Sequence, residues 1–325
     1  MIRTVLRAAA SMAALSLAGA PGQAQTYEDR TQEEEQRFFP DEPGWTERFA
    51  VDVEDAPIAS LDAQLVPLPA PRDAPRYDVT LKGQLAGFDV GRVFISAAVG
   101  TDAYAIRYRM EQKGVARWFS DGQQTARGTG TFDGQAITGS YYYKHDYEAE
   151  DDQQRVELYR PTGARRLRLW SAPEYWFSDP VPEDLALGAT DPMGALIRLG
   201  FPAAPAGQSP CDRLAKVYDG RKRFDLRFEP TGTVRLRRGG KGRYEGEAHR
   251  CKMTLTKVAG YRPKDRGADE GDLYVYLAPV PAELRSETFA YVPVRVEAKR
   301  GLIGGVLEAK YPKITAPDGS VIELY

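Results

Sequence analysis

Several segments of the chain alternate apolar and polar side chains with a period of two, the pattern of a β-strand that buries one face. In residues 77–85 the Tyr, Val and Leu side chains share one parity, and Asp, Thr, Lys and Gln take the other. The same alternation recurs in residues 104–111, 223–228 and 273–277. These segments therefore predict strands with one face in a core and the other in water.

Short turns separate the predicted strands, because Asp-Gly pairs supply the positive φ angles that tight hairpins require. Strands joined by short turns pair antiparallel, since parallel strands need long crossover connections. We expect roughly twelve to fourteen strands, and a sheet of that size must curl or close to protect its edges. The expected fold is all-β, a large curled antiparallel meander that is open or spiral and barrel-like. The Asp-Gly pairs are Asp121-Gly122, Asp133-Gly134, Asp219-Gly220 and Asp318-Gly319.

One segment predicts a main helix. Thr190 is the expected N-cap, Asp191 and Pro192 suit the first turn, and Gly200 ends the segment. A single apolar helix in a curled sheet most simply packs on the concave side. Residues 115–119 are also compatible with a short helical turn. The apolar face of the main helix consists of Met193, Leu196, Ile197 and Leu199.

The first 24 residues have the three parts of a secretory signal peptide. Arg3 and Arg7 give a positive start, residues 8–20 are apolar, and Gly22-Gln23-Ala24 offers small residues for cleavage after Ala24. A transmembrane anchor is the alternative, but Ser and Pro interrupt the stretch, and a span needs roughly 20 apolar residues. We expect the mature protein in a bacterial periplasm, and we expect no later segment to span a bilayer.

The mature chain divides into two unlike parts. Residues 25–75 are acidic around Glu33-Glu34-Glu35 and rich in proline from residue 57 onward, so they predict an extended linker or a strap on the domain. Residues 76–325 carry the strand patterns and predict a single β-rich domain. The formal charge of −2 becomes −4 when Arg3 and Arg7 leave with the signal peptide. A nearly neutral protein lacks the overall positive charge that is typical of proteins that bind nucleic acids.

The chain has two cysteines, Cys211 and Cys251. An even pair in an exported chain predicts a disulfide. Such a bond closes a loop of about 40 residues and contributes roughly 3–4 kcal/mol on the chain-entropy estimate. A metal site is the weaker alternative, because no CxxC spacing occurs and His249 is the one further ligand type nearby.

Four arginines on two neighbouring predicted strands form a candidate ligand surface. If the valine and leucine between them face the core, the arginines point outward. Guanidinium groups match phosphate geometry, so this stripe predicts contact with phosphate groups of lipids or lipopolysaccharide. The alternative is an ordinary solvated face with Asp225 and Glu229 as cross-strand partners. The four residues are Arg223, Arg227, Arg235 and Arg237.

Large aromatic side chains gather in two stretches. The three rings of Tyr141-Tyr142-Tyr143 cannot all point inward on a strand, so some lie on the opposite face. Such rings can line the mouth of an apolar cavity. Core packing, or cover by the proline-rich strap, is the alternative. The candidate ligand-binding aromatics are Tyr142, Trp170, Tyr175 and Trp176.

No catalytic motif stands out. The chain has two histidines, His145 and His249, and lacks the HExxH, GxSxG and Walker patterns. An acidic cluster offers the oxygen ligands that calcium prefers, but it lacks the spacing of an EF-hand, and a solvated hairpin turn is the favoured interpretation. We therefore expect no catalytic residue, no metal and no cofactor. The cluster comprises Asp146, Glu148, Glu150, Asp151 and Asp152.

Several stretches carry a family resemblance, and the most specific is Val217-Tyr218-Asp219-Gly220-Arg221-Lys222-Arg223-Phe224-Asp225-Leu226. Over roughly residues 77–300 the chain resembles the exported bacterial family catalogued as domain of unknown function 3108. The resemblance implies an exported β-rich domain without established catalytic residues, and it places the two cysteines where that family has its pair. The other stretches are Tyr77-Asp78-Val79, the hairpin around Gly87, Asp191-Pro192-Met193-Gly194-Ala195-Leu196 and Val258-Ala259-Gly260-Tyr261.

These observations leave three functions open. The leading hypothesis is a non-enzymatic periplasmic protein that binds a lipid-like or apolar component of the cell envelope. The second is an envelope scaffold that meets a protein partner through residues 25–76. The third is a hydrolase with an unrecognised site, in which His145 or His249 meets a carboxylate and a nucleophile. We do not expect nucleic acid as a partner.

Overall fold

The computed structural model describes residues 71, 73–112, 123–134, 136–147, 154–159, 168–172, 181–237, 240–261, 271–300 and 303–325. The predicted signal peptide, most of residues 25–75, the helical turn at 115–119 and the Asp121-Gly122 turn lie outside these ranges. Within them the chain forms a fourteen-stranded antiparallel sheet, which confirms the all-β fold class. The strands are β1 (Arg76–Leu85), β2 (Phe88–Val99), β3 (Ala103–Gln112), β4 (Gln123–Asp133), β5 (Ala136–Tyr147), β6 (Gln154–Tyr159), β7 (Arg168–Ala172), β8 (Arg213–Tyr218), β9 (Arg223–Leu236), β10 (Gly246–Ala259), β11 (Asp272–Pro279), β12 (Tyr291–Arg300), β13 (Ile303–Thr315) and β14 (Val321–Glu323).

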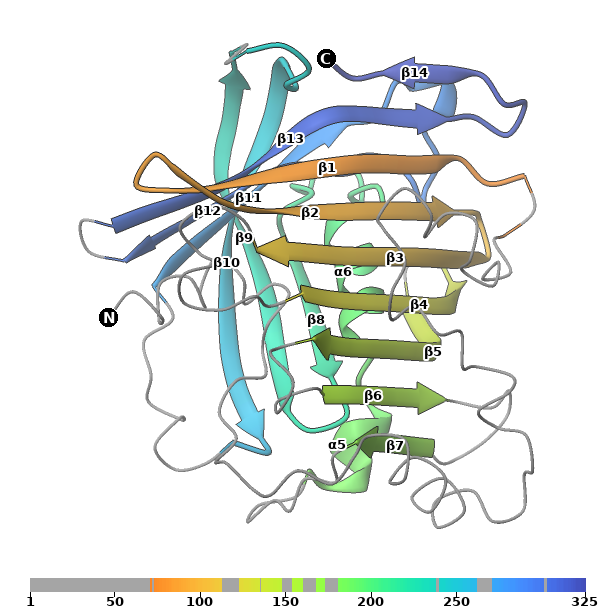
Figure 1. The fold of residues 1–325 in the computed structure, drawn as a ribbon. Coiled ribbons are helices and arrows are strands. Elements are labelled where there is room, and N and C mark those ends of the chain that lie inside the picture. The colour runs from red at the N-terminus through yellow and green to blue at the C-terminus, as the bar shows by residue number, and fades with distance from the viewer. Residues whose placement is uncertain are drawn as a thin grey trace.

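Two meanders build the sheet and meet at its centre. Strands β1 to β7 pair in chain order, strands β8 to β13 do the same, and β1 lies beside β13. Strand β14 adds to β13 outside this path. In Figure 1, β2 to β7 run across the view while β8, β9 and β10 run steeply behind them. The sheet therefore curls on itself, as the sequence predicts.

The main helix, α6 (Pro192–Gly200), lies inside this curl. It contacts β3, β4 and β5 on one half of the sheet and β8 and β12 on the other. The helix is where the sequence predicts it, but its N-cap is Asp191 and not Thr190. Asp191 Oδ1 accepts hydrogen bonds from the backbone N–H groups of Met193 (2.8 Å) and Gly194 (2.9 Å). Within the described ranges, no helix has the length and apolar character needed to cross a membrane.

Glycines allow the start of α6 to approach β4 and β5 closely. A Cβ atom at Gly128 of β4 would lie 2.6 Å from Met193 Cβ, and one at Gly139 of β5 would lie 2.0 Å from Asp191 Oδ2. Packed protein interiors do not tolerate such approaches without movement. The helix can therefore lie this close to the sheet because Gly128 and Gly139 have no side chain.

Gly128→Ala should lower the free energy of unfolding by about 1–3 kcal/mol, the usual cost of overpacking a core. Met193 Cβ is fixed to the helix backbone, so the clash is relieved only if α6 shifts. Urea unfolding of both proteins measures the difference. Gly304→Ala is the matched control, because its new Cβ would lie 3.9 Å from the nearest atom, Ala298 O. An equal loss in the control would contradict the close-packing argument.

The core lies on both sides of α6. Met193, Ile197 and Phe201 pack into an apolar cluster with the inner side chains of β1, β2 and β3. Ala195 and Leu199 pack into a second cluster with β8 to β12. The concave side of the sheet is thus occupied by the helix and its neighbours.

The edge strand β8 is covered by the segment that leads into α6. The Thr190 N–H donates to Lys216 O (2.9 Å), and the Tyr218 N–H donates to Thr190 O (2.8 Å). Arg198 Nε on the helix donates to Leu214 O (2.7 Å). These bonds use backbone groups that an open edge would offer to another chain. The short helices α5 (Glu183–Leu187) and η2 (Ala282–Leu284) are not predicted by the sequence patterns.

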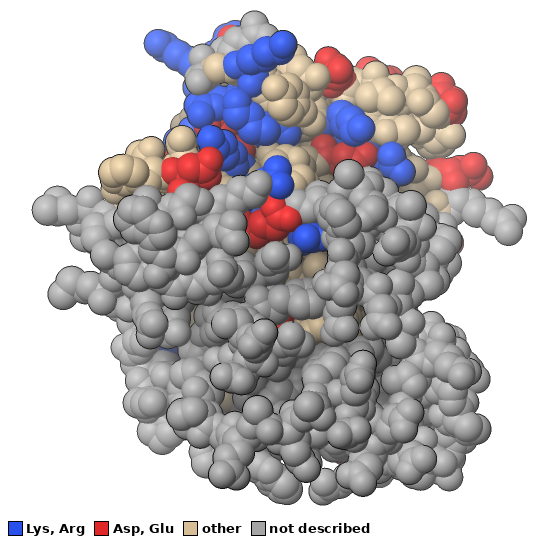
Figure 2. Space-filling view, in the orientation of Figure 1, with Lys and Arg blue, Asp and Glu red and all other residues tan. Residues whose placement is uncertain are grey.

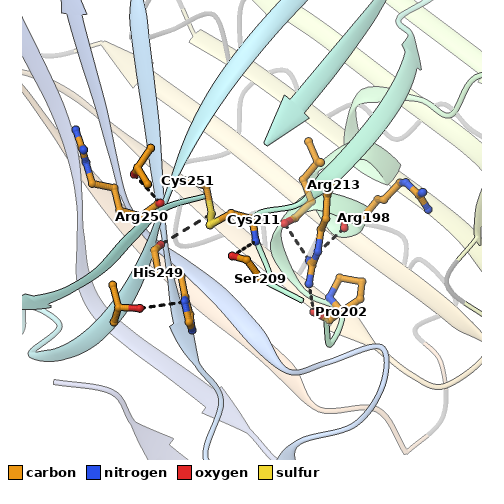
Figure 3. The surroundings of a disulfide bond; sticks show 11 residues. Arg198, Pro202, Ser209, Cys211, Arg213, His249, Arg250 and Cys251 are labelled. Atoms are coloured by element: carbon orange, nitrogen blue, oxygen red, sulfur yellow. Dashed lines mark hydrogen bonds between the residues drawn. A yellow bond between two sulfur atoms is a disulfide. The ribbon is translucent and has the colours of Figure 1, made fainter. Parts of the chain in front are cut away.

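Cys211 and Cys251 form a disulfide inside the second apolar cluster (Figure 3). Their side chains are 1% and 0% exposed, and the bond ties the segment after α6 to the middle of β10. Beside it, Arg213 donates to the carbonyl oxygens of Leu199 (3.1 Å) and Pro202 at the end of the helix. Burial lowers the pKa of Arg213 to about 10.

Candidate functional site

A groove of about 790 Å³ lies on the outer face of strands β1 to β5 and of the adjoining β13 and β14. This face is opposite α6, because Gly128 faces the helix and its neighbour Arg127 faces the groove. Arg107 and Arg109 reach the same face by alternating with core residues of β3. We call this site the outer groove. Its described lining includes Arg76, Asp78, Thr80, Phe94, Ser96, Arg107, Arg109, Thr125, Arg127, Tyr143, Tyr311, Lys313, Glu323 and Tyr325.

Arg127 provides a positive charge at the floor of the outer groove. Its guanidinium carbon lies 5.5 Å from the ring centroid of Tyr141 and 4.9 Å from that of Tyr143. Arg127 Nη2 also donates to the Tyr141 hydroxyl at 3.3 Å. All three side chains are buried, and a desolvated cation gains more from an aromatic face than an exposed one does. The two rings therefore hold the cation in place.

The outer groove carries more positive than negative charge. Its described lining holds four arginines and one lysine against two carboxylates. Arg76 Nε lies 3.0 Å from Asp78 Oδ2, and Arg109 Nη2 lies 3.3 Å from Glu111 Oε1 at the edge of the site. With five cations against two carboxylates, the described lining carries a net positive formal charge, which favours an anion.

Aromatic rings give the same groove apolar surface. Phe94 and Tyr143 lie on its floor, and Tyr311 and Tyr325 meet edge to face at its rim with their centroids 5.4 Å apart. Tyr311 has a positive φ of 50° and its N–H donates to Gly242 O at 2.6 Å, so the β9–β10 connection helps to place it. The outer groove thus combines cations with rings.

The predicted arginine stripe does not lie in the outer groove. Arg227, Arg235 and Arg237 are exposed, and Arg227 pairs with Asp212 and Glu229 at 3.5 Å each. Figure 2 shows Lys and Arg side chains gathered at the top of the view, where Figure 1 places the end of the β9–β10 hairpin. These exposed arginines therefore belong to a separate, solvated surface.

Arg223 corrects the prediction that all four arginines point into water. It is 4% exposed. Its Nη1 donates to Phe224 O at 2.6 Å and to Asp225 Oδ1 at 2.6 Å. The family-specific stretch around it builds a turn, in which Asp219 Oδ1 accepts from the N–H groups of Arg221 (2.9 Å) and Lys222 (2.6 Å). Arg223 is therefore part of the β8–β9 connection and not of an outward stripe.

Tyr142 is a core residue and not the mouth of a cavity. It is 2% exposed and packs in the cluster that faces α6. The pocket beside it has a volume of about 20 Å³, which is room for about one water molecule and not for an acyl chain. Its neighbour Tyr143, on the other face, lines the outer groove. Trp170 lies in β7 opposite Glu157, and Tyr175 and Trp176 fall outside the described residues.

Asp146 differs from the predicted solvated turn. It is 8% exposed, lies on β5, and its Oδ2 is 2.7 Å from Lys144 Nζ. Gln124 Nε2 also donates to its carboxylate. The rest of the acidic cluster lies outside the described residues. Among the residues that are described, no group of three or more His, Cys, Asp and Glu side chains is arranged to hold a metal ion.

The two histidines lie in different surroundings. His145 is 1% exposed, with Nδ1 3.4 Å from the Tyr143 hydroxyl. His249 Nδ1 is 3.3 Å from Thr233 Oγ1, and its ring meets Tyr291 edge to face. Burial lowers the pKa of His249.

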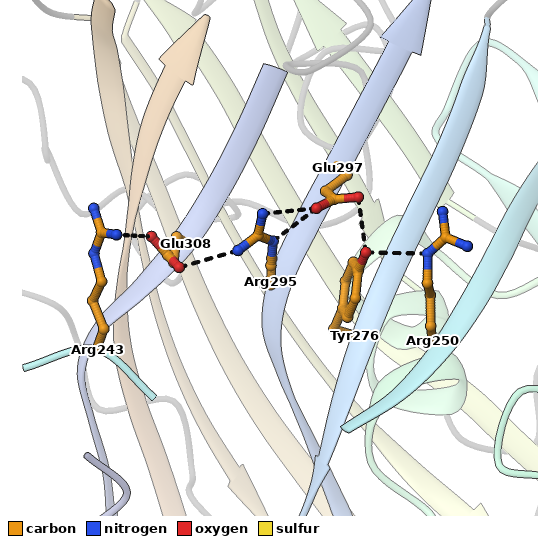
Figure 4. A network of polar contacts seen from close by, with 6 residues as sticks. All are labelled: Arg243, Arg250, Tyr276, Arg295, Glu297 and Glu308. Carbon is orange, nitrogen blue, oxygen red and sulfur yellow. Dashed lines mark hydrogen bonds and ion pairs between the residues drawn. The ribbon is translucent and has the colours of Figure 1, made fainter. Parts of the chain in front are cut away.

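A second charged row crosses the outer face of β10 to β13, and its charges are paired with each other (Figure 4). Glu308 lies 2.9 Å from Arg243 and 3.2 Å from Arg295, and Arg295 lies 2.7 Å from Glu297. Tyr276 donates to Glu297 at 2.8 Å. Burial alone would raise the pKa of Glu297, but the bonds from Tyr276 and Arg295 outweigh it and lower that pKa. This row stabilises the sheet and offers less charge to a ligand than the outer groove does.

Comparisons with known proteins match one family model and one solved structure. The model of the family described as "Protein of unknown function (DUF3108)" matches residues 76–310. A crystal structure of a beta-barrel-like protein of domain of unknown function DUF1849 from Brucella abortus is 11% identical, with a TM-score of 0.40, and the match covers 75% of this chain and 99% of that one. No curated protein matches the chain. The family match spans most of the sequence and confirms the resemblance seen in its motifs, so the chain belongs to the DUF3108 family.

Proposed function

We propose that this protein is exported to the periplasm and binds an anionic amphipathic component of the cell envelope in the outer groove, without catalysing a reaction. The observation that carries the proposal is the combination of arginines and aromatic rings around one groove of about 790 Å³. The signal-peptide pattern of residues 1–24 and the buried cysteine pair support the compartment.

The size and chemistry of the outer groove suit such a ligand. Small-molecule sites usually measure about 300–1,000 Å³ and combine apolar walls with a few placed polar groups. The forked guanidinium groups of Arg107 and Arg109 match the oxygens of a phosphate or carboxylate. Phe94 and Tyr143 offer ring surface to an acyl chain. The filled concave side makes the outer face the better candidate for this role.

Decyl phosphate should bind the mature protein, and Arg107→Gln should weaken that binding about tenfold, because a charge-assisted hydrogen bond is worth roughly 1.5–3 kcal/mol. Isothermal titration below the micellar concentration measures the affinity. Arg227→Gln is the matched control, since it removes the same charge from the exposed face of β9. Equal binding by both variants and the parent would contradict the assignment of the site.

Native mass spectra of protein purified from periplasm without detergent test the ligand class directly. We expect an adduct of lipid mass that is lost on denaturation and reduced in Arg107→Gln. A clean apo mass together with no binding of decyl phosphate would overturn the proposal. Capture of a constant partner from crosslinked periplasm, lost on deletion of residues 25–76, would then favour the scaffold hypothesis.

A further inference from the structure

The charges of the chain are divided unevenly between its N-terminal segment and the rest. Residues 25–62 contain twelve Asp and Glu side chains and three Arg, a net charge of −9. Residues 63–325 contain 39 Lys and Arg against 34 Asp and Glu, a net charge of +5. We call residues 25–62 the acidic segment. Two parts of opposite sign in one chain attract each other.

The acidic segment joins the described fold at one end of the outer groove. The Val99 N–H donates to Pro75 O at 3.1 Å. Pro71 lies against the turn after β2, since a Cβ atom at Gly100 would be 3.0 Å from Pro71 Cβ. The next residue of β1 is Arg76, which lines the groove. The chain therefore arrives beside the first cation of the site.

The connecting residues are long enough for the acidic segment to reach the whole groove. Residues 63–70 span about 25 Å if extended, at about 3.1 Å per residue for a proline-rich stretch. The strand of the groove that lies farthest from β1 is β5, four spacings away, which is about 19 Å at about 4.8 Å per spacing. Every arginine from Arg76 on β1 to Arg127 on β4 lies within this reach.

We propose that the acidic segment binds the outer groove of its own chain and competes there with anionic ligands. Carboxylates of the segment take the same guanidinium groups that hold a phosphate. Because the segment is tethered, its effective concentration is of the order of millimolar. A ligand therefore occupies the groove only when its concentration, relative to its Kd, exceeds the effective concentration of the segment relative to the Kd of the segment. The docking stands whether or not the groove also takes a small amphipathic molecule.

The outer groove fits this partner better than the other charged surfaces. The cations of the row on β10 to β13 pair with Glu297 and Glu308. Cations of the groove are paired as well, Arg76 with Asp78 for example, so the point where the acidic segment enters decides between the surfaces. Arg227 pairs with Asp212 and Glu229. The exposed end of the β9–β10 hairpin is basic, but Arg235 lies opposite Glu247 in the strand register. It also lacks the neighbouring point of entry that Arg76 gives the groove.

Zero-length carbodiimide coupling of the full mature chain tests where the acidic segment lies. The reagent joins a carboxylate to a lysine amine in direct contact, and Lys313 is an exposed lysine in the groove lining. In 10 mM salt we expect Lys313 to be linked to carboxylates of residues 25–62, and the link to be lost in 500 mM salt. Links to Lys241 at the β9–β10 hairpin instead, or no link from the segment, would overturn the proposal.

A full-chain variant with the twelve carboxylates of residues 25–62 changed to amides supplies the second measurement. It should bind decyl phosphate at least tenfold more tightly than the parent in 10 mM salt, with no difference in 500 mM salt. A variant with the same residues in scrambled order is the control and should behave as the parent does, because the attraction depends on charge.

The two measurements separate this proposal from the proposed function. A Lys313 link without binding of decyl phosphate by any variant would support the docking and overturn the ligand site. Equal affinity of parent and neutralised variant, with no Lys313 link, would overturn the docking and leave the ligand site supported.

Discussion

Removing the disulfide by the double change Cys211→Ala and Cys251→Ala should lower the free energy of unfolding by about 4 kcal/mol. The bond closes a loop of 40 residues, and the chain-entropy model gives that value for such a loop at 25 °C. Both side chains are buried among apolar residues, so the alanines also lose packing. Urea unfolding of parent and variant, with equal slopes, measures the difference.

The control for this change is Ser209→Ala, which keeps the bond. Ser209 Oγ accepts a hydrogen bond from the Cys211 N–H at 3.2 Å, so its loss should cost only about 1 kcal/mol. The end of α6 is also held by the bonds from Arg213 to Leu199 and Pro202. A loss below about 1 kcal/mol in the double variant would show that these bonds, and not the disulfide, fix the connection to β8.

The strand pattern predicts the fold well, because period-two alternation depends on neighbours within one strand. Tyr77, Val79 and Leu81 are buried as their parity requires, and Asp133-Gly134 forms the turn between β4 and β5. The order of the two meanders in the sheet is not predicted by these patterns. Pairing of β1 with β13 joins residues more than 200 positions apart, and no local pattern encodes it.

Local rules also miss contacts that come from tertiary packing. Thr190 is a good N-cap by residue type, but its backbone is used by β8, which leaves Asp191 to cap the helix. Arg223 has the parity of an outward residue, yet its hydrogen bonds to Phe224 O and Asp225 keep it buried. The first error arises because β8, which is distant in sequence, uses the Thr190 backbone. The second arises from contacts that Arg223 makes with its own neighbours in sequence, which the parity of a strand does not describe.

The sequence indicates part of the lining of the outer groove. Arg107 and Arg109 alternate with core residues in β3, so their outward direction was predictable. That Arg127 and Tyr143 stand beside Arg107 depends on the register of β3, β4 and β5, which sequence alone does not fix. Among the consecutive tyrosines, the sequence therefore predicts Tyr142 as the ligand-binding ring, whereas Tyr143 lines the groove.

Stability should fall steeply above pH 10. Burial raises the pKa of Tyr77, Tyr108 and Tyr142 well above 10 in the folded protein. Their hydroxyls stay protonated in the folded state while those of the unfolded chain ionise, so these three groups by themselves release three protons on unfolding. The stability that these three groups contribute is therefore fully present below pH 10. It is lost as the pH rises, by about 4 kcal/mol per pH unit. Urea unfolding at pH 8, 10 and 11 measures this slope.

Tyr77→Phe separates ionisation from other effects of alkali. The Tyr77 hydroxyl donates to Pro293 O at 2.8 Å, so the variant should lose about 1 kcal/mol at pH 8. Above pH 10 it should lose stability less steeply than the parent by about 1.4 kcal/mol per pH unit, because one proton fewer is released. Tyr311→Phe, at a side chain 53% exposed, is the control and should leave the slope unchanged. If Tyr77→Phe and the parent have the same slope, the buried tyrosines are not the cause of alkaline unfolding.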